Sequence, residues 1–548
     1  MASSTGAEVI PGEGATRVPI ARGSSNVASD KETSRGPLGD MSADELRAQL
    51  HRMADWVADY KETIGQRPIS PSVAPGEIGD RLLAGGWEDS TPIEQILRDF
   101  DRIVMPGILH WGHPAFLGYF GSTSNGPALL GEIAAAALNV SAMTWKTSPA
   151  ATEMETTTLD WIRELIGIPD SFFGVVYDTA SIATLHALAA ARERVGPGIR
   201  RRGLAGRSDL PTYRIYASDQ AHSSVEKAAI VLGIGEENVV RVRTDDDYRL
   251  DVTSLREAID SDIRAGHRPL AVVATVGTTS TASVDPVAEI RDLCYARGIW
   301  LHVDAAYGGA FGALEEGRWA MAGIEGADSL VVNPHKWLFV PLDFSALYTR
   351  HPQILRSVFS LVPEYLRGDT TSDGVPDYMD YGIQFGRRFR ALKAWMVFRS
   401  FGRKGIVSRI REHRRLAQLF ASWIDADPSF VRTAPVIMGI VCFRYQPSTA
   451  EGEEGNGSEG EEGNGANGEE GDVLNETIVE AVNAAGRTYL TRTTLKGRVV
   501  MRVGFGNVLT TEDHAARAWE EIRSQSQLVG ARTSAASASL PGLPVSAH

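Results

Sequence analysis

Between about Gly126 and Val340, helical stretches alternate with short apolar runs, and this alternation restricts the fold more than any other feature of the chain. The helical stretches include residues 128–137 and 181–194, and the apolar runs are residues 213–216, 270–275, 299–304 and 329–332. Most of these runs are continuously apolar, as expected for strands covered by helices on both faces. Strands that alternate with helices predict a largely parallel α/β sheet. Ligands bind such sheets at the carboxyl ends of the strands.

The segments on either side of this α/β region predict four further parts. Residues 1–37 are rich in Gly, Ser, Ala and Pro, which predicts a disordered tail. Residues 38–125 are predicted to be helical, and a capping box of Ser42 and Glu45 starts the first helix. The large α/β domain is assigned to residues 126–392, a smaller α+β domain to residues 393–529, and a second disordered tail to residues 530–548.

The smaller domain contains an acidic segment, residues 448–472, with nine Asp and Glu and no Lys or Arg. It is dominated by Glu, Gly, Asn and Ser, and a hydrophobic core cannot be built from that composition. We therefore expect a disordered, solvated insertion.

Composition and charge exclude several classes of protein. The 548 residues are 43% hydrophobic, but no apolar run approaches the roughly 20 residues that span a bilayer. The net charge of −14 argues against nucleic acid and anionic membranes as partners. The polar N-terminus has no apolar signal region. Two cysteines, Cys294 and Cys442, form neither a disulfide framework nor a metal site by themselves, so we expect a cytoplasmic protein without a metal.

Two strand ends carry the residues with the clearest chemistry. Lys336 follows the strand at 329–332 and has bulky apolar neighbours. Burial lowers the pKa of an amine and makes it a nucleophile toward carbonyls, as Schiff-base chemistry requires. Asp304 ends the strand before it, and a buried carboxylate is costly unless it faces a cation. The protonated ring nitrogen of pyridoxal phosphate is such a cation, and Ala306 is small enough to let a flat ring lie beside the strand.

Three further segments fit the same cofactor. His222 follows the strand at 213–216, where an imidazole can stack on a flat ring. Thr279 follows the strand at 270–275 and offers a hydroxyl to the edge of the cofactor. Residues Thr179, Ala180 and Ser181 lead into a helix, and a helix N-terminus with small residues suits a phosphate.

The chain resembles the pyridoxal-phosphate group II decarboxylases, and most closely the aromatic L-amino acid decarboxylases. The resemblance runs from about residue 40 to 525, outside the acidic insertion. The segments that carry it are residues 105–114, 116–120, 145–150, 218–224, 274–279, 302–307, 333–338 and 386–393.

The resemblance implies fold type I of the pyridoxal-phosphate enzymes. We therefore expect a mostly parallel seven-stranded sheet flanked by helices, an N-terminal helical segment that takes part in dimerisation, and a small C-terminal α+β domain. It also implies an obligate homodimer with shared active sites, in which a small amino acid is the substrate.

The resemblance assigns roles to individual residues. Lys336 is the lysine of the internal aldimine, Asp304 the partner of the ring nitrogen, His222 the ring-stacking histidine and Tyr365 a tyrosine on a mobile loop that reaches the partner's site. The other implied cofactor contacts are Thr179, Ala180, Ser181, Thr279, Ala306, Asn333, His335, Phe385 and Gly386. The implied substrate contacts are Trp111, Tyr119, Phe120 and Ser122.

These roles imply decarboxylation of an aromatic L-amino acid (Trp, Tyr, Phe or Dopa) to its amine and carbon dioxide, by way of a quinonoid that Tyr365 protonates. An aromatic aldehyde synthase is the first alternative, although members with that activity typically lack the loop tyrosine or the stacking histidine. A transaminase or carbon–carbon lyase of the same fold type is the second, and a relative that binds without turnover is the third. Several residues depart from the family pattern, among them Asp178, which stands where glycine is usual, and Ile182 and Met379, which replace charged residues.

Overall fold

The computed structural model describes residues 40–121, 123–196, 198–361, 375–447 and 468–538. They belong to two compact units, the first ending at Thr63 and the second beginning at Ile64. The first unit contains helix α1 (Ala43–Thr63). Its predicted capping box is confirmed, because the Ser42 amide donates to Glu45 Oε2 (2.9 Å) and the Glu45 amide donates to Ser42 Oγ (3.2 Å).

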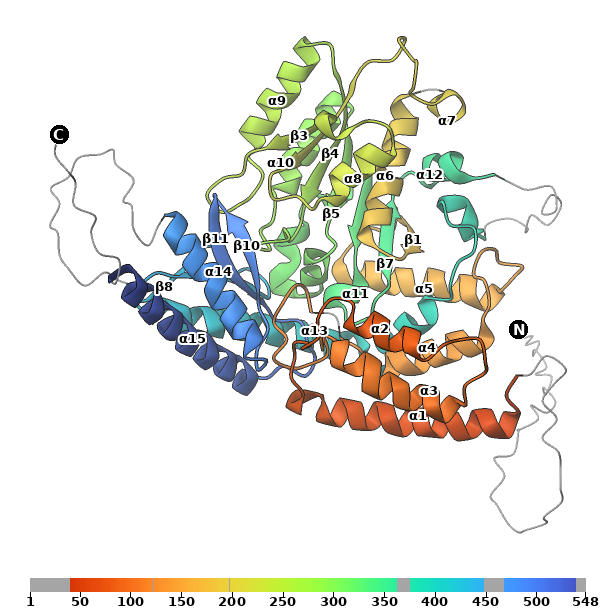
Figure 1. Cartoon of the computed structure of the whole chain (residues 1–548). Coiled ribbons are helices and arrows are strands. Elements are labelled where there is room, and N and C mark those ends of the chain that lie inside the picture. Colours follow the sequence, from red (N-terminus) through yellow and green to blue (C-terminus); the bar gives the residue numbers. More distant parts are fainter. Residues whose placement is uncertain (1–39, 122, 197, 362–374, 448–467, 539–548) are drawn as a thin grey trace, which may run out of the picture. The chain divides into compact units, whose positions relative to one another are not determined.

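A seven-stranded sheet lies at the centre of the second unit and confirms the predicted fold class (Figure 1). In spatial order its strands are β1 (Phe173–Tyr177), β7 (Ser345–Thr349), β6 (Ser329–Val332), β5 (Trp300–Asp304), β4 (Arg268–Thr275), β2 (Tyr213–Ser218) and β3 (Val239–Val242). Strand β7 runs antiparallel to both of its neighbours. The other pairs are parallel, so the carboxyl ends of β6, β5, β4 and β2 lie along one edge.

The strands are buried on both faces, as their continuous apolar runs predict. On β4, Ala271 and Val273 enter one core and Val272 and Ala274 enter the other. Helices of this region are α4 (Gly126–Leu138), α5 (Pro149–Ile166), α6 (Ala180–Val195), α7 (Ile199–Arg202), α8 (Ser224–Val231), α9 (Val252–Arg264), α10 (Val287–Arg297), α11 (Pro334–Trp337) and α12 (Pro352–Phe359). Apolar residues of α6 and α8 fill one core, and those of α5, α9 and α10 fill the other.

Two shorter helices precede the sheet, and a second, smaller sheet follows it. The helices are α2 (Glu77–Ala84) and α3 (Ile93–Asp99), which continues into a π-helical turn at Phe100–Val104. The small sheet has the order β10 (Thr491–Leu495), β11 (Arg498–Gly504), β9 (Ile440–Tyr445) and β8 (Phe430–Arg432), and its helices are α13 (Ala391–Asp425), α14 (Glu469–Ala484) and α15 (Glu512–Ala538). Across the ranges that the structure describes, every helix is too short or too polar to cross a membrane.

Two predicted boundaries differ from the structure. The acidic insertion is shorter than predicted at its end, because α14 begins at Glu469, and residues 448–467 lie outside the described ranges. Acidic residues in the first turn of a helix stabilise its positive end. Asp472 also accepts hydrogen bonds from Arg444 Nη1 (2.6 Å) and the Val499 amide (3.0 Å), so this acid belongs to the fold.

The second difference is at the C-terminus, where the predicted tail begins at residue 530 but α15 continues to Ala538. Val529 is buried in the core of the small sheet, which anchors the helix up to this point. The following residues are rich in alanine, the best helix former, so the helix continues beyond its last buried residue. Residues 539–548 lie outside the described ranges.

Candidate active site

The carboxyl ends of the parallel strands surround a cavity of about 180 Å³. Strand β6 leads to Asn333 and Lys336, β5 to Asp304 and Ala306, and β2 to His222. The residues that line the cavity are Phe120, Thr179, Ala180, Ser181, His222, Thr275, Gly277, Thr279, Asp304, Ala306, Tyr307, Asn333 and Lys336. The strand ends that the sequence singles out therefore meet at one place.

Lys336 lies on the short helix α11, directly after β6, and its amide donates to the Asn333 carbonyl (2.9 Å). An aromatic ring lies beside its amine: Lys336 Nζ is 4.6 Å from the centre of the Phe120 ring, which itself lies against the Tyr307 ring (4.2 Å between centres). Burial lowers the pKa of Lys336, Asp304 raises it and Arg502 lowers it further. A larger fraction of the amine is thus unprotonated and nucleophilic.

Asp304 and His222 approach the cavity from the ends of β5 and β2, with β4 lying between these two strands. Asp304 is 6% exposed, and one of its oxygens is fixed because Oδ1 accepts from the Ala306 amide (3.0 Å). The Ser224 amide donates to His222 Nδ1 (3.1 Å), which places the proton of a neutral imidazole on Nε2. Burial lowers the pKa of His222, Asp304 raises it and Lys336 lowers it.

The N-terminus of α6 forms another wall of the cavity. Thr179 precedes the first turn of this helix, and the exposed amides of that turn attract anions. Asp178, which departs from the family pattern, is held beside this turn. Its Oδ1 accepts from the Thr179 amide (2.6 Å), and its Oδ2 accepts from Gln384 Nε2 (3.0 Å).

The cavity fits pyridoxal phosphate. It combines an amine of lowered pKa for the aldehyde, a buried carboxylate for the ring nitrogen and a helix N-terminus for the phosphate. Thr275 Oγ1 is also buried with no hydrogen-bond partner in the described part of the chain, as expected for a hydroxyl that serves a ligand.

Sequence reasoning missed three of the lining residues: Thr275, Gly277 and Tyr307. Gly277 has a signal in the sequence, because a glycine directly after a buried strand often marks a close backbone approach. Its φ is +86°, and a Cβ atom there would lie 2.8 Å from the Gly308 nitrogen. Thr275 and Tyr307 have no such signal, because threonine and tyrosine are common in sheets.

Several predicted residues do not line this cavity. The rings of Trp111 and Tyr119 stack on each other at 5.2 Å. His335 is buried with its Nδ1 accepting from the Phe344 amide (2.9 Å), and burial lowers its pKa to about 3. Phe385 and Gly386 are exposed. Ser122 and Tyr365 lie outside the described residues.

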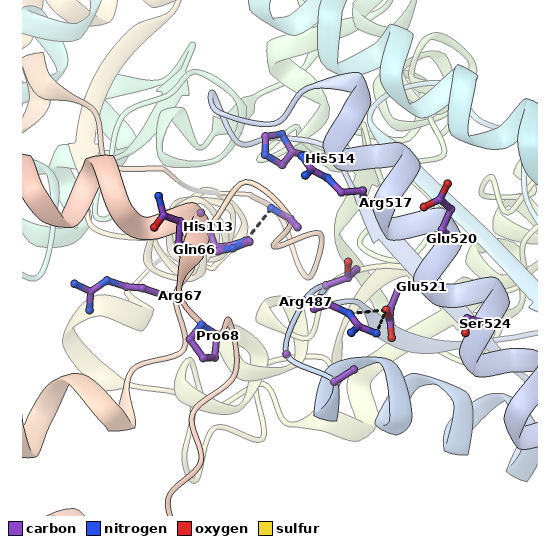
Figure 2. A pocket seen from close by; sticks show the side chains of 15 residues that line it. Gln66, Arg67, Pro68, His113, Arg487, His514, Arg517, Glu520, Glu521 and Ser524 are labelled. Carbon is purple, nitrogen blue, oxygen red and sulfur yellow. Dashed lines mark hydrogen bonds and ion pairs between the residues drawn. The ribbon is translucent and has the colours of Figure 1, made fainter.

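A larger cavity, of about 650 Å³, has a different composition (Figure 2). His113 and His514 line it, together with Arg487 and Glu521, which form an ion pair with Arg487 Nε donating to Glu521 Oε2 (2.8 Å). Its lining contains no lysine, so it lacks the amine that Schiff-base chemistry requires.

Comparison with known proteins supports this assignment. Residues 84–446 match the pyridoxal-dependent decarboxylase conserved domain. The chain is 36% identical to phenylacetaldehyde synthase from Arabidopsis thaliana over 89% of this chain and 97% of that protein. It is also 36% identical to aromatic-L-amino-acid decarboxylase from Sus scrofa over 88% of this chain and 96% of that protein. A crystal structure of Oryza sativa TDC with PLP and tryptamine superposes with a TM-score of 0.82, at 36% identity, over 90% of this chain and 99% of that chain. The chain therefore belongs to the pyridoxal-dependent decarboxylase family and uses pyridoxal phosphate.

Proposed function

We propose that the protein decarboxylates an aromatic L-amino acid of the Trp, Tyr, Phe or Dopa class to its amine and carbon dioxide. The observation that carries this proposal is the presence of Lys336, Asp304 and the N-terminus of α6 in one cavity. The named relatives act on aromatic substrates, and Phe120 and Tyr307 offer an aromatic wall that favours stacking of a ring.

Some residues of the chain would bind the cofactor, and others would transfer a proton. Pyridoxal phosphate, when bound, withdraws electrons from the α-carbon of the substrate. Lys336 would hold its aldehyde carbon, and Asp304 would keep its ring nitrogen protonated. Ser181 and Asn333 would hold the phosphate together with the first turn of α6. His222 would cover one face of the ring, and the Tyr365 hydroxyl would deliver a proton to the substrate α-carbon.

The alternative product is an aldehyde, because phenylacetaldehyde synthase is among the similar proteins. The presence of both His222 and Tyr365 favours the amine. An assay of the purified protein with Trp, Tyr, Phe, Dopa and His, measuring carbon dioxide and hydrogen peroxide together, separates the two. Carbon dioxide without peroxide supports the decarboxylase, and equal amounts of both would establish the synthase.

Replacing Tyr365 with phenylalanine should change the product. Without the phenolic proton, the electron-rich α-carbon reacts with dioxygen instead. We expect carbon dioxide release to continue while dioxygen and water are consumed and aldehyde, ammonia and hydrogen peroxide replace the amine. The matched control is Tyr295→Phe, because Tyr295 is 90% exposed on α10. Amine formation by Tyr365→Phe at the wild-type rate, without peroxide, would exclude Tyr365 as the proton donor.

The homodimer is part of the proposal, and an apolar face on α4 supports it. Three residues of this helix, Leu130, Ile133 and Leu138, are 63%, 55% and 60% exposed. Large apolar side chains gathered on one exposed helix mark an interaction surface. A second copy of the chain is the occupant we propose. Phe385 and Gly386 are exposed, as residues that approach a partner's cofactor would be.

The double variant Leu130→Glu, Ile133→Glu should convert the dimer to monomers, because two carboxylates would then be buried in an apolar interface. Sedimentation velocity should show the loss of about half the mass of the wild-type species. The control is Ile230→Glu, since Ile230 on α8 is similarly exposed (53%). If the double variant stays dimeric, α4 is not the interface.

The compartment is proposed from the cysteines. Cys294 and Cys442 are both free and buried. Burial raises the pKa of both thiols to about 12, so neither is a reactive thiolate. Free thiols are usual in the reducing cytoplasm, where we place the protein.

A further inference from the structure

Arg502 lies on strand β11 of the small sheet, yet its side chain joins segments that belong to the active site. Arg502 Nε donates to the Ser280 carbonyl (3.0 Å), which follows the cavity residue Thr279. Arg502 Nη1 donates to the Tyr119 carbonyl (2.7 Å). The guanidinium carbon is 4.8 Å from the centre of the Phe120 ring. One side chain therefore contacts both the wall of the cavity and the loop beside it.

The charge of this arginine is not neutralised by a carboxylate. Arg502 is only 4% exposed, and within the described ranges it forms no ion pair. Its Nη2 is also buried with no hydrogen-bond partner there. Two carbonyl acceptors do not neutralise this charge, and a buried charge without a carboxylate partner is costly. Stability alone therefore does not account for a positive charge at this position, and we look for its role in the active site.

The backbone that Arg502 holds is itself unusual. Tyr119 has a φ of +52°, in the left-handed region of backbone conformation that residues other than glycine seldom adopt. The hydrogen bond from Arg502 Nη1 fixes the carbonyl of this residue. The next residue, Phe120, is thereby placed with its ring against Lys336.

Arg502 and Lys336 share the Phe120 ring. Lys336 Nζ is 4.6 Å from its centre and Arg502 Cζ is 4.8 Å from it. The carboxylate of Asp304, on β5, favours a proton on Lys336, whereas Arg502 opposes one. Among the described residues, His222 and Tyr307 line the cavity with Lys336, and His335 adjoins it in the sequence. Burial lowers the pKa of both histidines and raises that of the tyrosine, so all three favour their neutral forms.

We propose that Arg502 is a positioning residue of the active site, which holds Phe120 against Lys336 and places a positive charge beside the ring that Lys336 contacts. The charge matters when the amine of Lys336 is free, because only the unprotonated amine can attack a carbon and displace the product. The proposal rests on the role of Lys336 proposed above. Borohydride reduction of the wild-type protein tests that role separately, so failure of one is distinguishable from failure of the other.

The test is a pH titration of the near-visible absorption of the pyridoxal-phosphate-loaded protein, which reports protonation of the nitrogen that Lys336 contributes. Arg502→Gln removes the charge but keeps an amide donor for the Ser280 and Tyr119 carbonyls. Loss of a nearby positive charge stabilises the protonated form, so the midpoint should rise by about one pH unit. In the cofactor-free protein, the rate at which an amine-reactive reagent labels Lys336 depends on pH. The midpoint of that pH dependence should also rise by about one pH unit in Arg502→Gln.

Two variants separate charge from structure. Arg502→Lys keeps the charge and should keep the wild-type midpoint, even where its melting temperature falls. Arg444→Gln is the matched control, because Arg444 is a buried arginine on the neighbouring strand β9 and pairs with Asp472. It should lower the melting temperature and leave the midpoint unchanged. An unchanged midpoint in Arg502→Gln, or equal displacements in Arg502→Gln and Arg502→Lys, would overturn the proposal.

Discussion

Replacing Lys336 with alanine should reduce amine formation by more than about a thousandfold, the usual order for removing a group that reacts covalently. The amine lies beside Phe120, its pKa is lowered by burial, and Asp304 lines the same cavity. The wild-type protein with pyridoxal phosphate should be yellow, and borohydride should bleach it and fix the cofactor to Lys336. Peptide mapping by mass spectrometry identifies the labelled lysine.

Lys393 provides the internal control for this labelling. Its side chain is buried, at 2% exposure, and its Nζ pairs with Glu132 Oε1 at 2.6 Å. Lys393 is not among the residues that line the cavity with Lys336. We therefore expect no label on Lys393. If the cofactor is fixed to a lysine other than Lys336, the proposed site is wrong.

The largest loss of stability is expected from Glu155→Ala. Glu155 on α5 and Arg387 have side chains that are 3% and 5% exposed, and Arg387 Nη2 lies 2.6 Å from Glu155 Oε1. Arg387 also donates to the carbonyls of Ala142 and Val176. Removing the carboxylate leaves a buried guanidinium without its partner, which costs about 3–5 kcal/mol. Urea unfolding followed by circular dichroism measures the change.

The control for Glu155→Ala lies on the same helix. Glu164 pairs with Arg403 at 3.3 Å, and both side chains are more than half exposed. Exposed pairs contribute about 0–1 kcal/mol, so Glu164→Ala should be nearly neutral. A double replacement of Glu155 and Arg387 by Leu and Met should recover much of the lost stability, since it buries no charge. Equal effects of Glu155→Ala and Glu164→Ala would contradict the expectation.

The sequence predicts the large sheet well because its strands are buried on both faces and bounded by helices. Residues at the ends of parallel strands must lie along one edge, so Asp304, Lys336 and His222 are brought together by topology alone. Strand β7 is different, because a short buried run has the same apolar pattern whether it pairs parallel or antiparallel. Its antiparallel pairing with β1 and β6 therefore could not be read from the residues.

The contribution of Arg502 to the site also could not be predicted. An arginine in an apolar strand of a different sheet has no periodic or motif signal that points to a distant cavity. Only the packing of β11 against the Tyr119–Phe120 turn brings it there. Asp472 shows the opposite kind of error, in which a residue of the fold is predicted to be solvated. The composition of the acidic insertion assigns Asp472 to solvent, whereas in the structure it pairs with the buried Arg444.

The place of β1 at the edge of the sheet has a consequence for how the chain is made. Its partner is β7, and the register joins Phe173 to Thr349. A ribosome releases residues in order, so β1 emerges long before the strand that fixes it, and such distant pairing slows folding. Helix α6 follows β1 after only two residues. The phosphate end of the cofactor site is therefore completed late in synthesis, and a nascent chain that stops before Ser345 should be unable to take up pyridoxal phosphate.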